Sequence, residues 1–183
     1  MQDLLADARL PPSTRGWLLT SLAELEERDG RAAAADAAYR GVLRLGRDTY
    51  AAIAYADFLI AQKRPGEALA VLKDETRTDP VLLRLAIAAT RANAPSRERD
   101  VGEMRERIAL ANERPEASVF HGREQAMFAL ALARGDVSQQ REPLDLLILA
   151  EAARASGRRD AIEEARRLKS SLGLHDRRID AVL

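Results

Sequence analysis

The sequence predicts an all-α fold of about ten helices. Apolar residues make up 46% of the chain but aromatic residues only 4%, and alanine and leucine supply most of the apolar side chains. The residues that favour strands are sparse and never alternate with polar residues, so a β-sheet is not expected. Glycine and proline separate apolar segments of helical spacing, which predicts short helices joined by tight turns.

The clearest pattern lies in residues 49–80, which predict a hairpin of two antiparallel helices. The first helix carries apolar side chains on more than one face, as a helix flanked on two sides requires. Pro65 and Gly66 predict the turn, and the second helix runs from Glu67 to Arg77 with one apolar side. Neither helix can bury its apolar face alone, so the hairpin needs neighbours of the same kind.

Similar helices are predicted on both sides of this hairpin. Ser13 or Thr14 is the expected N-cap of a helix that Asp29 and Gly30 end. At the C-terminus, a frayed turn is the alternative to a short last helix. The helices outside the central hairpin are expected at residues 2–9, 14–28, 31–45, 81–92, 97–112, 116–134, 143–156, 158–171 and 176–183.

Two neighbouring hairpins repeat with a period of 33 residues, which separates Ala35 from Ala68 and Tyr39 from Leu72. This period, with a small residue at a helix crossing and a large one a turn later, resembles the tetratricopeptide repeat. Pro80 matches the proline that ends a repeat in that family, whereas Arg47 stands at the equivalent position of the preceding repeat. The resemblance implies a right-handed α-solenoid over residues 1–183.

Residues 121–136 and 140–153 resemble a bacterial branch of that family with no established biochemical role. The relatives have a further helix between these two segments, and its absence here predicts an irregular junction at residues 135–142. The helix that starts near Pro143 is then expected to take the place of the absent helix and to pack against residues 116–134. The resulting hairpins are 13–45, 49–77, 79–113 and 116–156, followed by a C-terminal cap at 158–183.

The sequence does not predict an enzyme, a metal site or a cofactor site. The chain has no cysteine and two histidines, His121 and His175, which fall in separate hairpins. Neither histidine is accompanied by the residues that would complete a metal-ligand set or a catalytic pair. Glycine-rich phosphate-binding motifs are absent from the sequence. We expect His121 to take part in a salt-bridged helix start.

The charge pattern argues against binding to nucleic acid. The 29 basic and 29 acidic residues give zero formal net charge and are interspersed along the chain, without a basic stripe. No apolar segment is long enough to cross a membrane, and residues 1–10 do not have the pattern of a secretion signal. We therefore expect a cytoplasmic protein, or a periplasmic one if a signal was removed from a longer precursor.

The resemblance implies that the first helix of each hairpin lines a concave groove that binds an extended peptide or a partner helix. Trp17 and Tyr50 are the expected aromatic anchors, with packing between helices as the alternative. The candidate partner-binding residues are Trp17, Thr20, Glu24 and Glu27 in the first hairpin, Tyr50, Ile53, Asp57 and Ile60 in the second, and Leu82, Leu85 and Ala89 in the third.

The expected function is a non-enzymatic scaffold for protein–protein interactions. Some tetratricopeptide repeat proteins hold a peptide's terminal carboxylate with lysine, asparagine and arginine, but the matching positions here are Thr20, Glu24 and Ala54. That binding mode is therefore not expected. Self-association through an end hairpin stays open, because residues 2–9 would cover little of the N-terminal end. The alternative function is a small-ligand sensor or a regulatory subunit of a larger assembly, for which we would expect a closed cavity near His121, Arg123 and Gln125.

Overall fold

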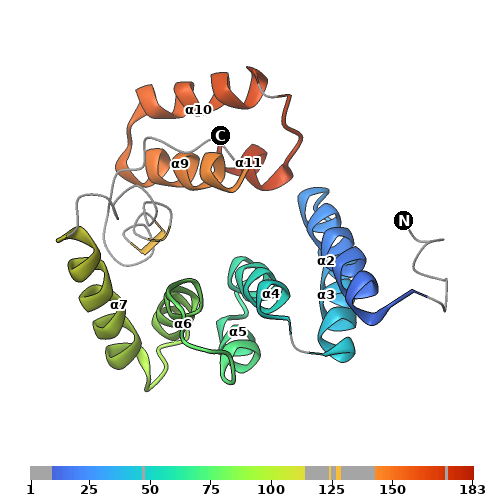
Figure 1. Cartoon of the computed structure of the whole chain (residues 1–183). Helices are drawn as coiled ribbons and strands as arrows, with labels where there is room; N and C mark the ends of the chain where they lie inside the picture. Colours follow the sequence, from blue (N-terminus) through green and yellow to red (C-terminus); the bar gives the residue numbers. More distant parts are fainter. Residues whose placement is uncertain (1–9, 47, 114–123, 125–126, 129–142, 172) are drawn as a thin grey trace. The chain divides into compact units, whose positions relative to one another are not determined.

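The computed structural model describes residues 10–46, 48–113, 124, 127–128, 143–171 and 173–183. Over these residues the chain is all-helical, with nine helices and no strand (Figure 1). The predicted all-α class is confirmed. Three of the expected elements lie wholly or largely outside the described residues. They are the helix at 2–9, the helix at 116–134 and the irregular junction at 135–142.

The chain divides into two compact units, residues 1–76 and residues 77–183. In the first unit, α2 (Pro12–Arg28) pairs with α3 (Ala32–Leu45), and α4 (Thr49–Ala61) pairs with α5 (Pro65–Leu72). Helix α4 also packs on both α2 and α3. These four helices thus form two helical hairpins, and α4 is the helix that joins them.

Small and large side chains alternate in the core of the first unit. Ala35 and Ala68, the two alanines one period apart, are each 0% exposed, and Tyr39 and Leu72, one turn later, are equally buried. Because alanine adds little bulk, it lets the backbone of a neighbouring helix approach closely. The ring of Tyr39 stacks on that of Tyr55 with 5.2 Å between centroids, which joins α3 to α4.

A charged network around Asp36 adds to this packing. Its Oδ1 atom accepts hydrogen bonds from Arg64 at 2.8 Å and from the Tyr55 hydroxyl at 2.9 Å. Arg64 also holds both carboxylate oxygens of Glu67, at 2.6 and 2.7 Å. Burial would raise the pKa of Asp36, but the hydrogen bonds from Arg64 and Tyr55 outweigh it and lower that pKa. The ionised Asp36 therefore connects α3, α4 and the start of α5.

Several helix ends differ from the prediction. Helix α2 starts at Pro12, with neither Ser13 nor Thr14 as its cap, because proline suits the first turn of a helix. For the same reason Pro65 begins α5, and the turn is made by the preceding residues, where Lys63 has a φ of 60°. Helix α5 ends at Leu72, because the charged residues that follow would bury no apolar side chain if they continued the helix.

In the second unit, α6 (Asp79–Arg91) pairs with α7 (Arg97–Asn112). Every residue from Val81 to Ala89 is buried, whereas α7 is buried along a narrow stripe that includes Val101 and Met104. Helix α9 (Pro143–Ser156) packs against α10 (Arg159–Ser171) and α11 (Arg177–Val182), around a core of Ala150, Ala165 and Ile179. The last helix therefore forms, as one of the two predicted alternatives.

Asp100 is the most buried charged residue described, with 0% of its surface exposed. Its Oδ1 atom accepts hydrogen bonds of 3.0 Å from both Arg77 and Arg99. Burial would raise the pKa of Asp100, but hydrogen bonds from the side chains of Ser96 and Arg77 outweigh it and hold the pKa below its usual range. The ionised Asp100 on α7 therefore holds Arg77, which lies in the segment before α6, next to α7.

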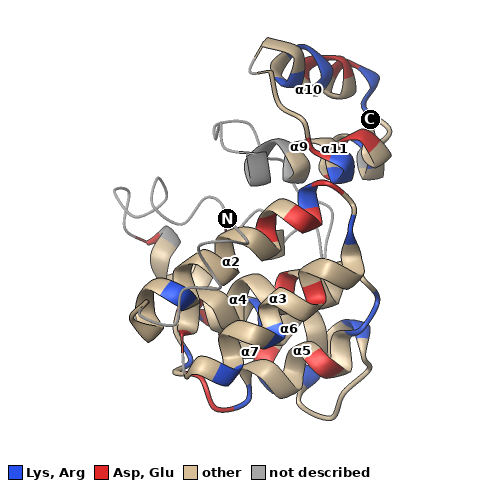
Figure 2. Ribbon diagram, turned by 90° about the vertical axis from the view of Figure 1, so that its right-hand side faces the viewer, with Lys and Arg blue, Asp and Glu red and all other residues tan. Residues whose placement is uncertain are grey.

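Basic and acidic residues are interspersed over the described helices (Figure 2). Within the described part of the chain, no helix is both long and apolar enough to span a membrane.

The alanine at the α4/α5 crossing gives a first prediction. Replacing Ala68 with leucine adds three carbons where none of the side chain is exposed, so we expect the free energy of unfolding to fall by about 1–3 kcal/mol. The same substitution at Ala70, which is exposed on the same helix, is expected to change it by less than about 0.5 kcal/mol. Urea unfolding followed by circular dichroism measures both, and equal losses would contradict the described packing.

The buried carboxylate gives a second prediction. Because the pKa of Asp100 is lower in the folded chain, its ionised form stabilises the fold above about pH 4, and this contribution is lost as the pH falls further. We expect Asp100→Asn to cost about 1–3 kcal/mol at neutral pH, and the difference from the wild type to shrink in acid. Urea unfolding at several pH values tests this, with Glu106→Gln on the exposed side of α7 as the control. A difference that stays constant in acid would contradict the role given to the ionised Asp100.

Candidate functional site

Five predicted partner-binding residues lie on adjoining stripes of α2 and α4, and we call this surface the α2/α4 face. Trp17 and Glu24 are seven residues apart on α2, which places them on one side of the helix. On α4, Tyr50, Ile53 and Asp57 share one side in the same way. Both stripes belong to the first unit of the chain.

The two aromatic residues of this face are exposed. Trp17 is 67% exposed and Tyr50 is 64% exposed, the two largest values among the large apolar side chains described as exposed. Neither is packed between helices, which was the alternative for both. Side chains of this size in water offer a partner much apolar area to bury.

A hydrogen bond joins the two stripes. The hydroxyl of Tyr50 donates to the Oε1 atom of Glu24 over 2.7 Å, between residues on different helices. This contact fixes the orientation of the Tyr50 ring beside α2. A second carboxylate of α2, that of Glu27, accepts a 3.3 Å hydrogen bond from the Tyr39 hydroxyl. Glu24 and Glu27 of α2 thus each contact a tyrosine of a neighbouring helix.

The same pattern occurs in both repeats. Trp17 and Tyr50 are 33 residues apart, as are Glu24 and Asp57, which is the period that relates the two hairpins. Each first helix therefore carries an aromatic residue in its first turns and a carboxylate two turns later. Sequence reasoning selected all four residues but missed the spacing that they share.

Of the six other candidate residues, Glu27 is partly exposed on α2 and the remaining five are buried. Thr20 is 4% exposed, and its hydroxyl donates to the carbonyl oxygen of Gly16 within the same helix. Leu82 is 0% and Leu85 is 7% exposed on α6. Ile60 and Ala89 are buried as well. These side chains are occupied by packing within the chain, so we leave them out of the α2/α4 face, and the exposed part of the candidate site lies in the first unit.

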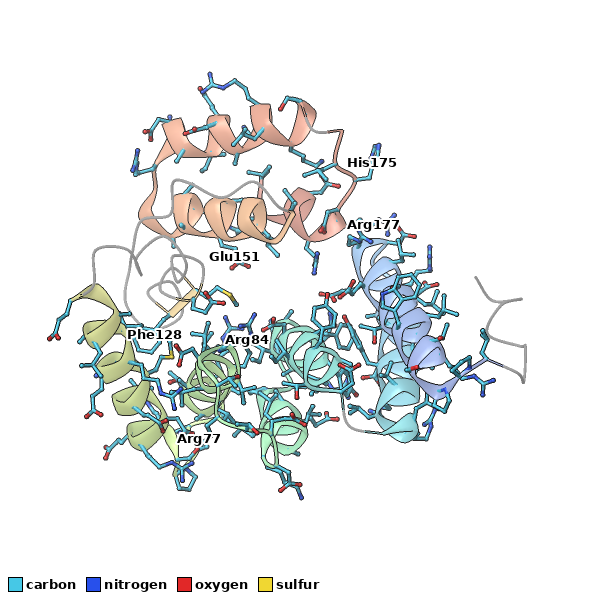
Figure 3. All side chains as sticks on the ribbon, in the orientation of Figure 1. Arg77, Arg84, Phe128, Glu151, His175 and Arg177 are labelled. Carbon is cyan, nitrogen blue, oxygen red and sulfur yellow. The ribbon has the colours of Figure 1, made fainter. Side chains whose placement is uncertain are left out.

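Arg84 is a buried charged residue that the sequence analysis did not select. It is 4% exposed in the apolar helix α6, and its guanidinium donates to the Pro80 carbonyl oxygen and lies 3.7 Å from the sulfur of Met127 (Figure 3). An arginine inside an otherwise apolar helix was the signal that could have drawn attention to it.

Of the two histidines, only His175 lies in the described part of the chain. His175 is exposed between α10 and α11 and points away from these helices, whereas His121 lies outside the described residues (Figure 3). Arg123 and Gln125, which with His121 marked the alternative ligand cavity, also lie outside them. Over the described ranges, no three histidine, aspartate or glutamate side chains are grouped so that they could hold a metal ion.

In comparisons with known proteins, the chain matches no protein-family model, no curated protein and no solved structure.

The hydrogen bond between the stripes gives a third prediction. Because the Tyr50 side chain is exposed, removing its hydroxyl in Tyr50→Phe should cost less than about 1 kcal/mol of folding stability. Tyr39→Phe, which removes a hydroxyl from a buried ring, is the comparison and should cost at least as much. Urea unfolding of both variants checks this order. A larger loss for Tyr50→Phe would mean that the α2/α4 face is needed for folding and is less suited to binding a partner.

Proposed function

We propose that this chain is a non-enzymatic interaction protein that binds a segment of a partner protein on the α2/α4 face. The exposure of both Trp17 and Tyr50 is the observation that carries the proposal. Large aromatic side chains are enriched among the residues that dominate interface energies, and two of them on adjacent helices can contact one segment. A folded chain gains no stability from leaving them in water.

We further propose that the hairpins stack as a solenoid like that of the tetratricopeptide repeat. The packing of α4 on both helices of the preceding hairpin supports this arrangement, as does the burial of Ala35 and Ala68 one period apart. In such a stack the first helices line the inner surface. The α2/α4 face would then be part of that surface, where an extended segment or a partner helix can bind.

The fourth prediction tests the proposed function by affinity capture from the source cell. Wild-type bait is compared with the Trp17→Ala, Tyr50→Ala double variant, which should lose a specific set of captured proteins because it lacks both exposed rings. Circular dichroism and thermal unfolding establish that the variant is folded. Leu110→Ala is the matched control, because Leu110 is 62% exposed on α7, outside the α2/α4 face.

Identical sets of proteins from all three baits would contradict the proposal. Light scattering at several concentrations adds a second readout, because a second copy of the chain could also occupy the face. If the double variant no longer forms a dimer but captures the same proteins as the wild type, the α2/α4 face binds a second copy of the chain and not another protein.

A further inference from the structure

We infer that the segment bound on the α2/α4 face is basic, with arginine or lysine side chains next to apolar ones. This inference rests on the proposed function and names the chemistry of the partner. It follows from two features of the same face, its carboxylates and its exposed aromatic rings.

The carboxylates give the face a negative charge. Helix α4 contains no lysine or arginine, and Asp57 is its one charged residue. Glu24 adds a second carboxylate from α2, and the Tyr50 hydroxyl contacts one of its two oxygens. A carboxylate can accept several hydrogen bonds, so this contact leaves Glu24 able to accept others from a guanidinium or an ammonium group.

Several nearby arginines are paired on other surfaces of the first unit. Arg40 and Arg64 form ion pairs with Asp36 and Glu67, on α3 and α5. Arg31 forms ion pairs with Glu26 and Asp29 at the turn between α2 and α3.

Arg28 is the arginine that lies nearest to Glu24 along α2. Its Nε atom donates to the backbone carbonyl oxygen of Glu24 over 3.4 Å, so this contact is not made with the carboxylate. No ion pair joins these two residues, but Arg28 lies one turn after Glu24 on the same side of α2, so Glu24, Asp57 and Arg28 together leave the face with one net negative charge.

The exposed aromatic rings favour the same kind of partner. The faces of tryptophan and tyrosine rings attract cations, and arginine also stacks on them. A partner that places a cation near Trp17 or Tyr50 would gain from the ring and bury apolar area at the same time. An acidic partner would be repelled by Glu24 and Asp57 and would have no cation opposite it on α4.

The repeat fixes the spacing of these groups. An aromatic residue and a carboxylate seven residues apart on a helix lie about 10 Å apart along its axis. In an extended segment this distance corresponds to about three residues. The pattern occurs on both α2 and α4, so the face can contact two such pairs of apolar and basic side chains.

The fifth prediction tests the inference with synthetic peptides. The probe is a fluorescein-labelled, unstructured peptide that repeats arginine and leucine three positions apart, and its binding to the full chain is followed by fluorescence anisotropy. Two further probes replace every arginine with glutamine or with glutamate. We expect the affinity to fall in the order arginine, glutamine, glutamate, and to weaken with added salt.

Two double variants distinguish the effect of the carboxylates on the α2/α4 face from the effect of the net charge of the whole chain. Glu24→Gln with Asp57→Asn should weaken the arginine peptide by about ten-fold, because two charge-assisted contacts become neutral. Glu98→Gln with Glu106→Gln changes the net charge equally but alters exposed residues of α7, so it should change the affinity by less than about two-fold. Equal losses in both double variants would overturn the inference, because binding would then reflect total charge.

The aromatic variant distinguishes this inference from the proposed function. If Trp17→Ala with Tyr50→Ala abolishes binding of a peptide but the carboxylate variant does not, the inferred charge preference is wrong while the face remains a binding site. If the glutamate peptide binds as well as the arginine peptide, or no peptide binds, the inference also fails. If the aromatic variant neither weakens peptide binding nor changes the proteins captured from cells, the proposed function itself fails.

Discussion

The close approach of helices at two alanines is the constraint on which the first unit depends. Ala35 and Ala68 are fully buried, and each is followed one turn later by a large buried residue, Tyr39 or Leu72. Small residues let the helices meet, and the large ones fill the space that remains. The stacking of Tyr39 on Tyr55 and the ion pairs of Asp36 then connect α3 with the hairpin that follows. Helix α4 is covered by α2, α3 and α5 on the sides that contact them.

The α2/α4 face is what this packing leaves uncovered. Trp17 and Tyr50 occupy positions related by the repeat, and neither contributes to the buried core. The hydrogen bond from Tyr50 to Glu24 orders the face without burying it. The core and the proposed binding face therefore lie on different sides of the same two helices, so we expect variants of the exposed residues to keep most of the folding stability.

The strongly periodic helices could be predicted from the sequence. The residues at which helices end, and the side of each helix that stays exposed, could not. Helix α7 has the predicted bounds, because a narrow apolar stripe on a charged helix has one possible buried side. Helix α5 is shorter than predicted, because residues 73–77 have no apolar side chain that a longer helix would bury. Leu82 and Leu85 lie on a helix that is apolar all round, and periodicity alone does not show which sides of such a helix neighbours cover.

Trp17 allows a direct test of the account, since it is the single tryptophan of the sequence. The measurement is quenching of its fluorescence by acrylamide in the folded chain and in the chain unfolded by urea. An exposed indole that no helix covers should be quenched almost as strongly in the folded chain as in the unfolded one. Strong protection in the folded, monomeric chain would place Trp17 in a core, and would contradict both the described packing and the face that depends on it.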